Sequence, residues 1–108
     1  MGNLTDNEIM EQLQSEALGK GVKLTYTQKL FYVRLLRYGL EHGILCPDGI
    51  SVSLSVNELT RQLSISKRMV IQSLRILCDC GILLRYKGER SFPRGSDTTI
   101  LKKEFYER

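Results

Sequence analysis

The stretch SVNELTRQLSISKRMVIQSLRILCDCG, residues 55–81, decides the fold of this 108-residue chain. Its apolar residues recur at helical spacing on both sides of Ser64, which predicts two short helices joined by a tight turn. Ser55 and Ser66 each stand where a hydroxyl group can cap the first free N–H groups of a helix. Gly81 stands where the second helix should end. The stretch therefore predicts a helix-turn-helix.

The second of these helices, residues 67–80, has two faces of opposite character. At about 100° per residue, its apolar side chains share the inward face with one small hydroxyl residue. That face comprises Val70, Ser73, Leu74 and Leu77. The outward face comprises Arg68, Gln72 and Arg75, with Ile71 at its edge and Lys67 in the first turn. Basic residues in a first turn oppose the helix dipole at a cost of about 0.3–1 kcal/mol, which indicates that a partner requires them. An ordinary solvated face is the alternative interpretation.

Basic residues are concentrated in the second half of the chain. The net charge of the protein is +4, whereas residues 1–24 alone carry a net charge of −2. Residues 66–103 hold nine basic and three acidic residues, a net of +6. The nine are Lys67, Arg68, Arg75, Arg85, Lys87, Arg90, Arg94, Lys102 and Lys103. Such a concentration is typical of a protein with a polyanionic partner.

Two more helices are expected before the quoted stretch. Thr5 opens a capping box for an acidic amphipathic helix. This segment, residues 1–23, either packs on the rest of the chain or mediates dimerisation. Thr25 opens a second capping box, and the helix of residues 26–42 that follows has a broad apolar stripe, which predicts the central core helix. Residues 24–108 are expected to form the main domain.

Short apolar or alternating runs predict three strands, at residues 50–54, 82–87 and 98–103. Residues 44–48 predict a loop, and residues 104–108 a short tail. The connection between the last two strands is long, basic and rich in glycine and proline, so the two strands predict a β-hairpin with a basic tip. Phe92 beside Pro93 and Arg94 forms an apolar wedge next to a basic residue, which suits DNA phosphates or a minor groove. A merely solvated loop is the alternative interpretation.

Part of the quoted stretch is specific enough to suggest a family. LTRQLSISKRMVIQSLRILCDCGILLR, residues 59–85, is similar to the signature of GntR-type and related bacterial DNA-binding domains. The matching positions are Leu63, Ser66, Arg68, Val70, Leu74, Leu77 and Gly81-Ile82-Leu83. LTYTQKLFYVRLLRYGLEHG, residues 24–43, resembles the N-terminal winged-helix domains of plasmid and phage replication proteins. The resemblance implies a winged helix-turn-helix over residues 24–103: an α+β, mainly α fold with a three-helix core and a β-hairpin wing, here with an extra N-terminal helix.

The resemblance also implies which residues touch DNA. It places the contacts on the first turn of the recognition helix, residues 66–80, and on the wing, residues 85–98. The residues at those positions are Ser66, Lys67, Arg68, Gln72, Arg90 and Arg94. Side-chain chemistry adds two further candidates, which are Arg75 and Lys87.

The leading interpretation is a small transcriptional regulator that binds preferred sequences in double-stranded DNA. An accessory factor in plasmid or phage replication or in conjugative transfer is the alternative, and a winged-helix protein–protein adaptor is the alternative of another class. The sequence has no nucleophile elbow, phosphate loop or His/Cys cluster, which argues against an enzyme, and no metal, cofactor or small-molecule effector is expected. No apolar run reaches about 18 residues and the N-terminus lacks a secretory pattern, so we expect a cytoplasmic protein without a membrane partner.

Overall fold

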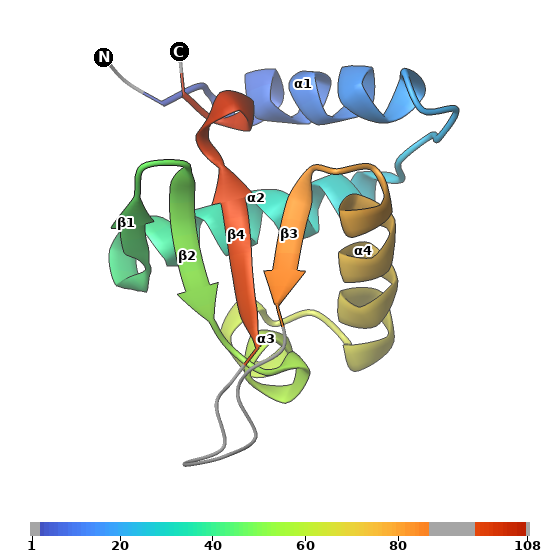
Figure 1. Ribbon diagram of the computed structural model, residues 1–108. Coiled ribbons are helices and arrows are strands. Elements are labelled where there is room, and N and C mark those ends of the chain that lie inside the picture. The colour runs from blue at the N-terminus through green and yellow to red at the C-terminus, as the bar shows by residue number, and fades with distance from the viewer. Residues whose placement is uncertain (1–2, 87–96, 108) are drawn as a thin grey trace.

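The computed structural model describes residues 3–86 and 97–107 (Figure 1). The helices are α1 (Asp6–Leu18), α2 (Tyr26–His42), α3 (Val56–Leu63), α4 (Lys67–Asp79) and the short 3-10 helix η1 (Lys103–Phe105). The strands are β1 (Ile44–Cys46), β2 (Gly49–Ser53), β3 (Leu83–Tyr86) and β4 (Thr98–Lys102). This order confirms the expected α+β, mainly α architecture with an extra N-terminal helix.

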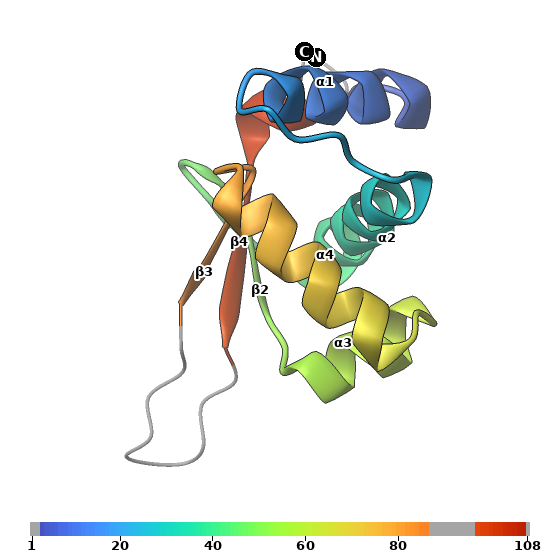
Figure 2. The same ribbon diagram turned by 90° about the vertical axis from the view of Figure 1, so that its right-hand side faces the viewer.

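The four strands form one antiparallel sheet in the order β1-β2-β4-β3. The helices lie against one of its faces, and no helix of the described residues covers the other (Figure 2). Side chains alternate between the two faces along each strand. The row that Ile50, Leu101 and Leu83 form across β2, β4 and β3 is therefore buried against the helices.

The expectation of a loop over residues 44–48 is wrong, because Ile44–Cys46 forms β1. The chain turns at Asp48 so that Cys46 pairs with Gly49 at the start of β2. Only glycine suits position 49. The φ of Gly49 is 152°, and an added Cβ would lie 1.9 Å from the carbonyl oxygen of Leu101. β1 has only three residues, so its sequence carries too little periodicity to be predicted.

Helix α2 forms the centre of the core, as expected. Phe31, Tyr32 and Leu35 are completely buried on it. Gly39 lets β2 approach α2 closely, since an added Cβ would lie 2.9 Å from Cγ2 of Ile50. The complete burial of the aromatic side chain of Tyr32 makes it a central core residue.

Helix α1 packs on the rest of the chain through α2 and η1. Ile9, Leu13 and Ala17 on its inner face are at most 1% exposed and belong to the same hydrophobic core as α2. This packing agrees with the first of the two alternatives for the acidic helix.

The expectation of a short tail after residue 103 is wrong as well. Phe105 and Tyr106 are only 4% and 3% exposed. The backbone N–H of Leu4 donates to the carbonyl oxygen of Tyr106 at 2.8 Å, which holds the two ends of the chain together. These two aromatic residues therefore close the core beneath α1.

Candidate nucleic-acid interface

The turn between α3 and α4 fixes how α4 is presented. Ser64 ends α3 in the left-handed conformation with a φ of 55°. Nη1 of Arg34 on α2 donates to the carbonyl oxygen of Leu63 at 2.9 Å, which satisfies a free carbonyl at the end of α3. Ile65 fills the space between the two helices and is 9% exposed. The turn is thus held by backbone geometry, a hydrogen bond and an apolar contact.

Helix α4 begins and packs as its sequence predicts. The hydroxyl oxygen of Ser66 accepts a hydrogen bond from the backbone N–H of Met69 at 3.3 Å, which caps the helix. The four residues expected to face inward are all buried. They are Val70, Ser73, Leu74 and Leu77. Because this face is anchored on the core, the opposite face must point to solvent.

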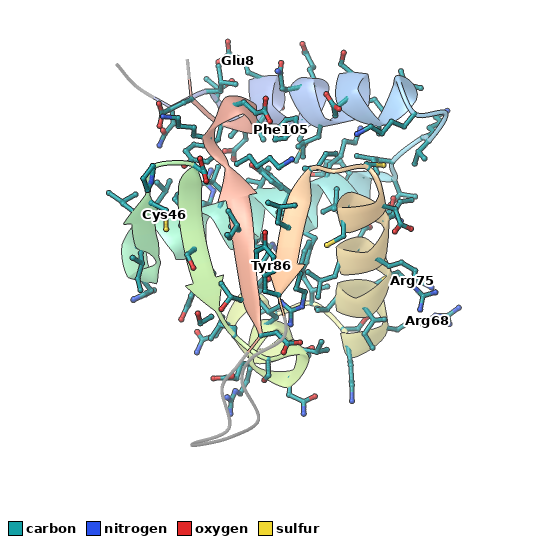
Figure 3. The ribbon with its side chains drawn as sticks, viewed as in Figure 1. Glu8, Cys46, Arg68, Arg75, Tyr86 and Phe105 are labelled. Atoms are coloured by element: carbon teal, nitrogen blue, oxygen red, sulfur yellow. The ribbon has the colours of Figure 1, made fainter. Side chains whose placement is uncertain are left out.

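The outward face of α4 gathers half of the predicted contact residues. Lys67, Arg68, Gln72 and Arg75 are all exposed. Arg68 and Arg75 project from α4 away from the body of the protein and toward the same side (Figure 3). These four residues, with the cap Ser66, form one continuous surface that we call the α4 face. Three other predicted contacts lie outside the described residues. They are Lys87, Arg90 and Arg94.

The charges on α4 run against its dipole, and the rest of the chain compensates for this. The first turn is basic, and the last turn holds Asp79 and no basic residue. Lysines from distant segments bind the free carbonyl groups at this end: Lys20 donates to Cys80, and Lys102 donates to Gly81 at 2.7 Å. Neither contact leaves a local signal in the sequence.

Comparisons with known proteins point to one fold. No family model and no curated protein matches the chain. A solved structure described as a Rep–DNA complex matches with a TM-score of 0.57 and 21% identity, over 74% of this chain and 62% of that one. The N-terminal domain of a DNA-binding protein matches with a TM-score of 0.56, with the same identity and coverage. With the order of helices and strands, these two likenesses decide the fold. The chain is a winged helix.

A third match is more distant. It is a MarR family transcriptional regulator from Silicibacter pomeroyi DSS, with a TM-score of 0.46 and 17% identity, over 88% of this chain and 52% of that chain. The winged helix described here thus spans less than two thirds of each of the three proteins.

Arg85 is a further basic residue with a structural role. Arg85 was counted among the residues available to a polyanion, but its side chain is only 14% exposed. It donates to the hydroxyl of Thr99 and, at 3.2 Å, to the carbonyl oxygen of Leu54, and it lies 3.6 Å from a carboxylate oxygen of Asp97. Burial lowers its pKa, against the opposing effect of Asp97. Arg85 therefore joins β3, β4 and the β2–α3 connection.

A hollow of about 260 Å³ lies beside the α4 face, between α4 and β3. Ile71, Leu74 and Cys78 supply part of its wall. Burial is the main cause that raises the pKa of the Cys78 thiol, so a reactive thiolate is disfavoured there. Ile71 is 40% exposed, and the sequence placed it only at the edge of the outward face.

Proposed function

We propose that the protein binds double-stranded DNA with a sequence preference and places α4 in the major groove. The observation that carries this proposal is the exposed line of Arg68, Gln72 and Arg75, opposite a face that is fully anchored in the core. Arginine can bond guanine and glutamine can bond adenine through two hydrogen bonds each, worth about 1–3 kcal/mol of discrimination per pair. The two solved structures with the higher TM-scores are described as DNA-binding, which supports the same interpretation.

The start of α4 suits a DNA phosphate. Its free N–H groups, the hydroxyl of Ser66 and the ammonium group of Lys67 all favour an anion. The end of β3 and the start of β4 lie at the same end of the molecule as the start of α4 (Figure 1). We therefore assign the segment that connects these strands to the DNA backbone or minor groove, through Lys87, Arg90 and Arg94.

This placement assigns different roles to the two parts of the chain. Residues 24–108 carry the DNA contacts, and residues 1–23 support the fold from the opposite end of the molecule. A homodimer through α1 would have to use its outer, mostly polar face, because Ile9, Leu13 and Ala17 are buried in the core of their own chain. The mass per particle in solution tests for such a dimer.

For the biological process, our first proposal is transcriptional regulation by occupation of a site. The second is an accessory role in replication or transfer, which the likeness to a Rep–DNA complex favours. Selection of bound sequences from a random duplex pool gives the preferred site. The occurrence of that site at a promoter would favour the first proposal, and its occurrence at an origin would favour the second. If the protein is instead a protein–protein adaptor, the selection should recover no DNA.

Salt dependence tests the DNA proposal directly. Affinity for a random duplex should fall steeply between about 50 and 200 mM salt, because binding releases counterions from phosphates. Lys67→Ala should reduce the slope of log affinity against log salt by about 1. Lys103→Ala is the matched control. Lys103 is also exposed but belongs to η1, which packs against α1 at the other end of the molecule (Figure 1). A flat salt response, or equal effects of the two variants, would contradict the proposal.

A further inference from the structure

A large apolar side chain lies exposed at the edge of the polar α4 face. Ile71 is 40% exposed, and a single exposed isoleucine is ordinary on a protein surface. Its position is more informative. Ile71 precedes Gln72 directly, lies about one turn after Arg68 and about one turn before Arg75, and so lies midway along the length of the surface proposed to read DNA.

The length of that surface matches a few base pairs. Arg68 and Arg75 are seven residues apart, about 10.5 Å along the helix axis, which spans roughly three base-pair steps of 3.4 Å. Asp79 continues the same line one turn further and is exposed. A carboxylate there repels phosphates, so the part of α4 that suits DNA ends at Arg75.

An A·T base pair presents two features in the major groove that suit the residues at the centre of this line. Adenine offers N6 and N7, which an amide side chain such as that of Gln72 can bond together. Thymine offers its C5-methyl group, which accepts apolar contact. Neighbouring residues on a helix rise by only about 1.5 Å, so Ile71 and Gln72 can reach one base pair or two adjacent pairs.

The packing of Ile71 suits it to such a contact. Ile71 lines the hollow between α4 and β3 together with Val56 and Leu74. A β-branched side chain in a helix keeps one strongly preferred χ1 rotamer. Because the side chain strongly prefers one rotamer before it binds, contact with a base costs little conformational entropy.

We propose that Ile71 is a specificity-determining residue that packs on the methyl group of a thymine. In this arrangement Gln72 bonds the adenine of the same or the adjacent pair, and Arg68 and Arg75 face guanines on either side. The proposal rests on the DNA-binding function proposed above and names the bases that the α4 face prefers: an A·T centre flanked by G·C pairs.

Replacing thymine by deoxyuracil tests this proposal, because the change removes only the C5-methyl group. The probe is a duplex recovered by selection from a random pool, with each thymine replaced in turn. Replacement of one particular thymine should weaken binding by the wild-type protein about fourfold relative to the unmodified duplex. This factor is equivalent to about 0.8 kcal/mol, the value for one buried methyl group. Ile71→Ala should bind the thymine and deoxyuracil duplexes equally. Ile44→Ala, which truncates an exposed isoleucine on β1, should keep the fourfold preference.

Three outcomes would overturn the proposal and leave the DNA-binding function intact, provided that salt-dependent duplex binding persists. They are a selection with no preferred A·T centre, equal wild-type affinity for thymine and deoxyuracil at every position, and an Ile71→Ala variant that keeps the full preference. Absence of duplex binding at low salt would instead overturn the proposed function itself. The wild-type comparison requires no variant, so equal affinity for thymine and deoxyuracil at every position overturns the proposal even if Ile71→Ala fails to fold.

Discussion

Two arginines of this chain, ten residues apart, have opposite surroundings. Arg75 is exposed on α4, whereas Arg85 is largely buried among Leu54, Asp97 and Thr99. Arg85→Ala should lower the free energy of unfolding by about 1–3 kcal/mol, because buried acceptors lose their donor. Urea unfolding followed by circular dichroism measures the loss.

Arg75→Ala is the matched control for this prediction. Since its side chain is exposed, the free energy of unfolding should change by no more than about 0.5 kcal/mol, while affinity for a preferred duplex falls. Equal losses of stability in the two variants would show that Arg85 does not join the strands as described.

At the scale of elements, α1 should contribute to stability and not to DNA contact. Leu13 is fully buried on its inner face, so Leu13→Ala should lower the free energy of unfolding by about 2–5 kcal/mol. Thermal and urea unfolding both report this change. Affinity for DNA, measured where the variant is still folded, should stay the same because α1 and the start of α4 lie at opposite ends of the molecule (Figure 1).

Leu18→Ala provides the comparison on the same helix. Leu18 is 59% exposed, so its truncation should change stability by no more than about 0.5 kcal/mol. If Leu13→Ala proves as harmless as Leu18→Ala, α1 is not part of the core.

Elements with strong local signals could be predicted from the sequence, and elements held by distant partners could not. Capping boxes at Thr5, Thr25 and Ser55 all form. In each, the cap hydroxyl accepts from the backbone N–H three residues later, and the side chain of that later residue accepts from the backbone N–H of the cap residue. β1 depends on pairing with β2, and η1 is held beneath α1 by tertiary packing. Neither leaves a periodic pattern in its own few residues.

The same distinction applies to the candidate site within the whole molecule. The α4 face follows from helical periodicity alone, so Arg68, Gln72 and Arg75 were placed correctly on the surface. The net charge of a segment does not show which of its basic side chains are free to bind a partner and which bond groups of the protein itself. Lys20 and Lys102 bind carbonyl groups 60 and 21 residues away, and only the tertiary structure brings these groups together.

The distribution of charge over the whole molecule leads to a last prediction, about two carboxylates. Asp79 ends the line of residues on the α4 face, whereas Glu11 is exposed on α1. Unit charges about 8 Å apart in water interact by about 0.5 kcal/mol, so Asp79→Asn should raise affinity for every duplex by about twofold. Glu11→Gln removes the same charge but should have no effect at physiological salt, because screening acts within about 8 Å and the molecule is 39 Å long.

Fluorescence anisotropy with a labelled duplex at two salt concentrations measures both variants. The gain from Asp79→Asn should grow at low salt, where screening weakens, and should be the same for preferred and random duplexes because phosphates carry no sequence information. A gain confined to one sequence would mean that Asp79 contacts a base. The part of α4 that reads DNA would then extend one turn beyond Arg75, and the predicted site would lengthen by about two base pairs, since one helical turn rises about 5.4 Å.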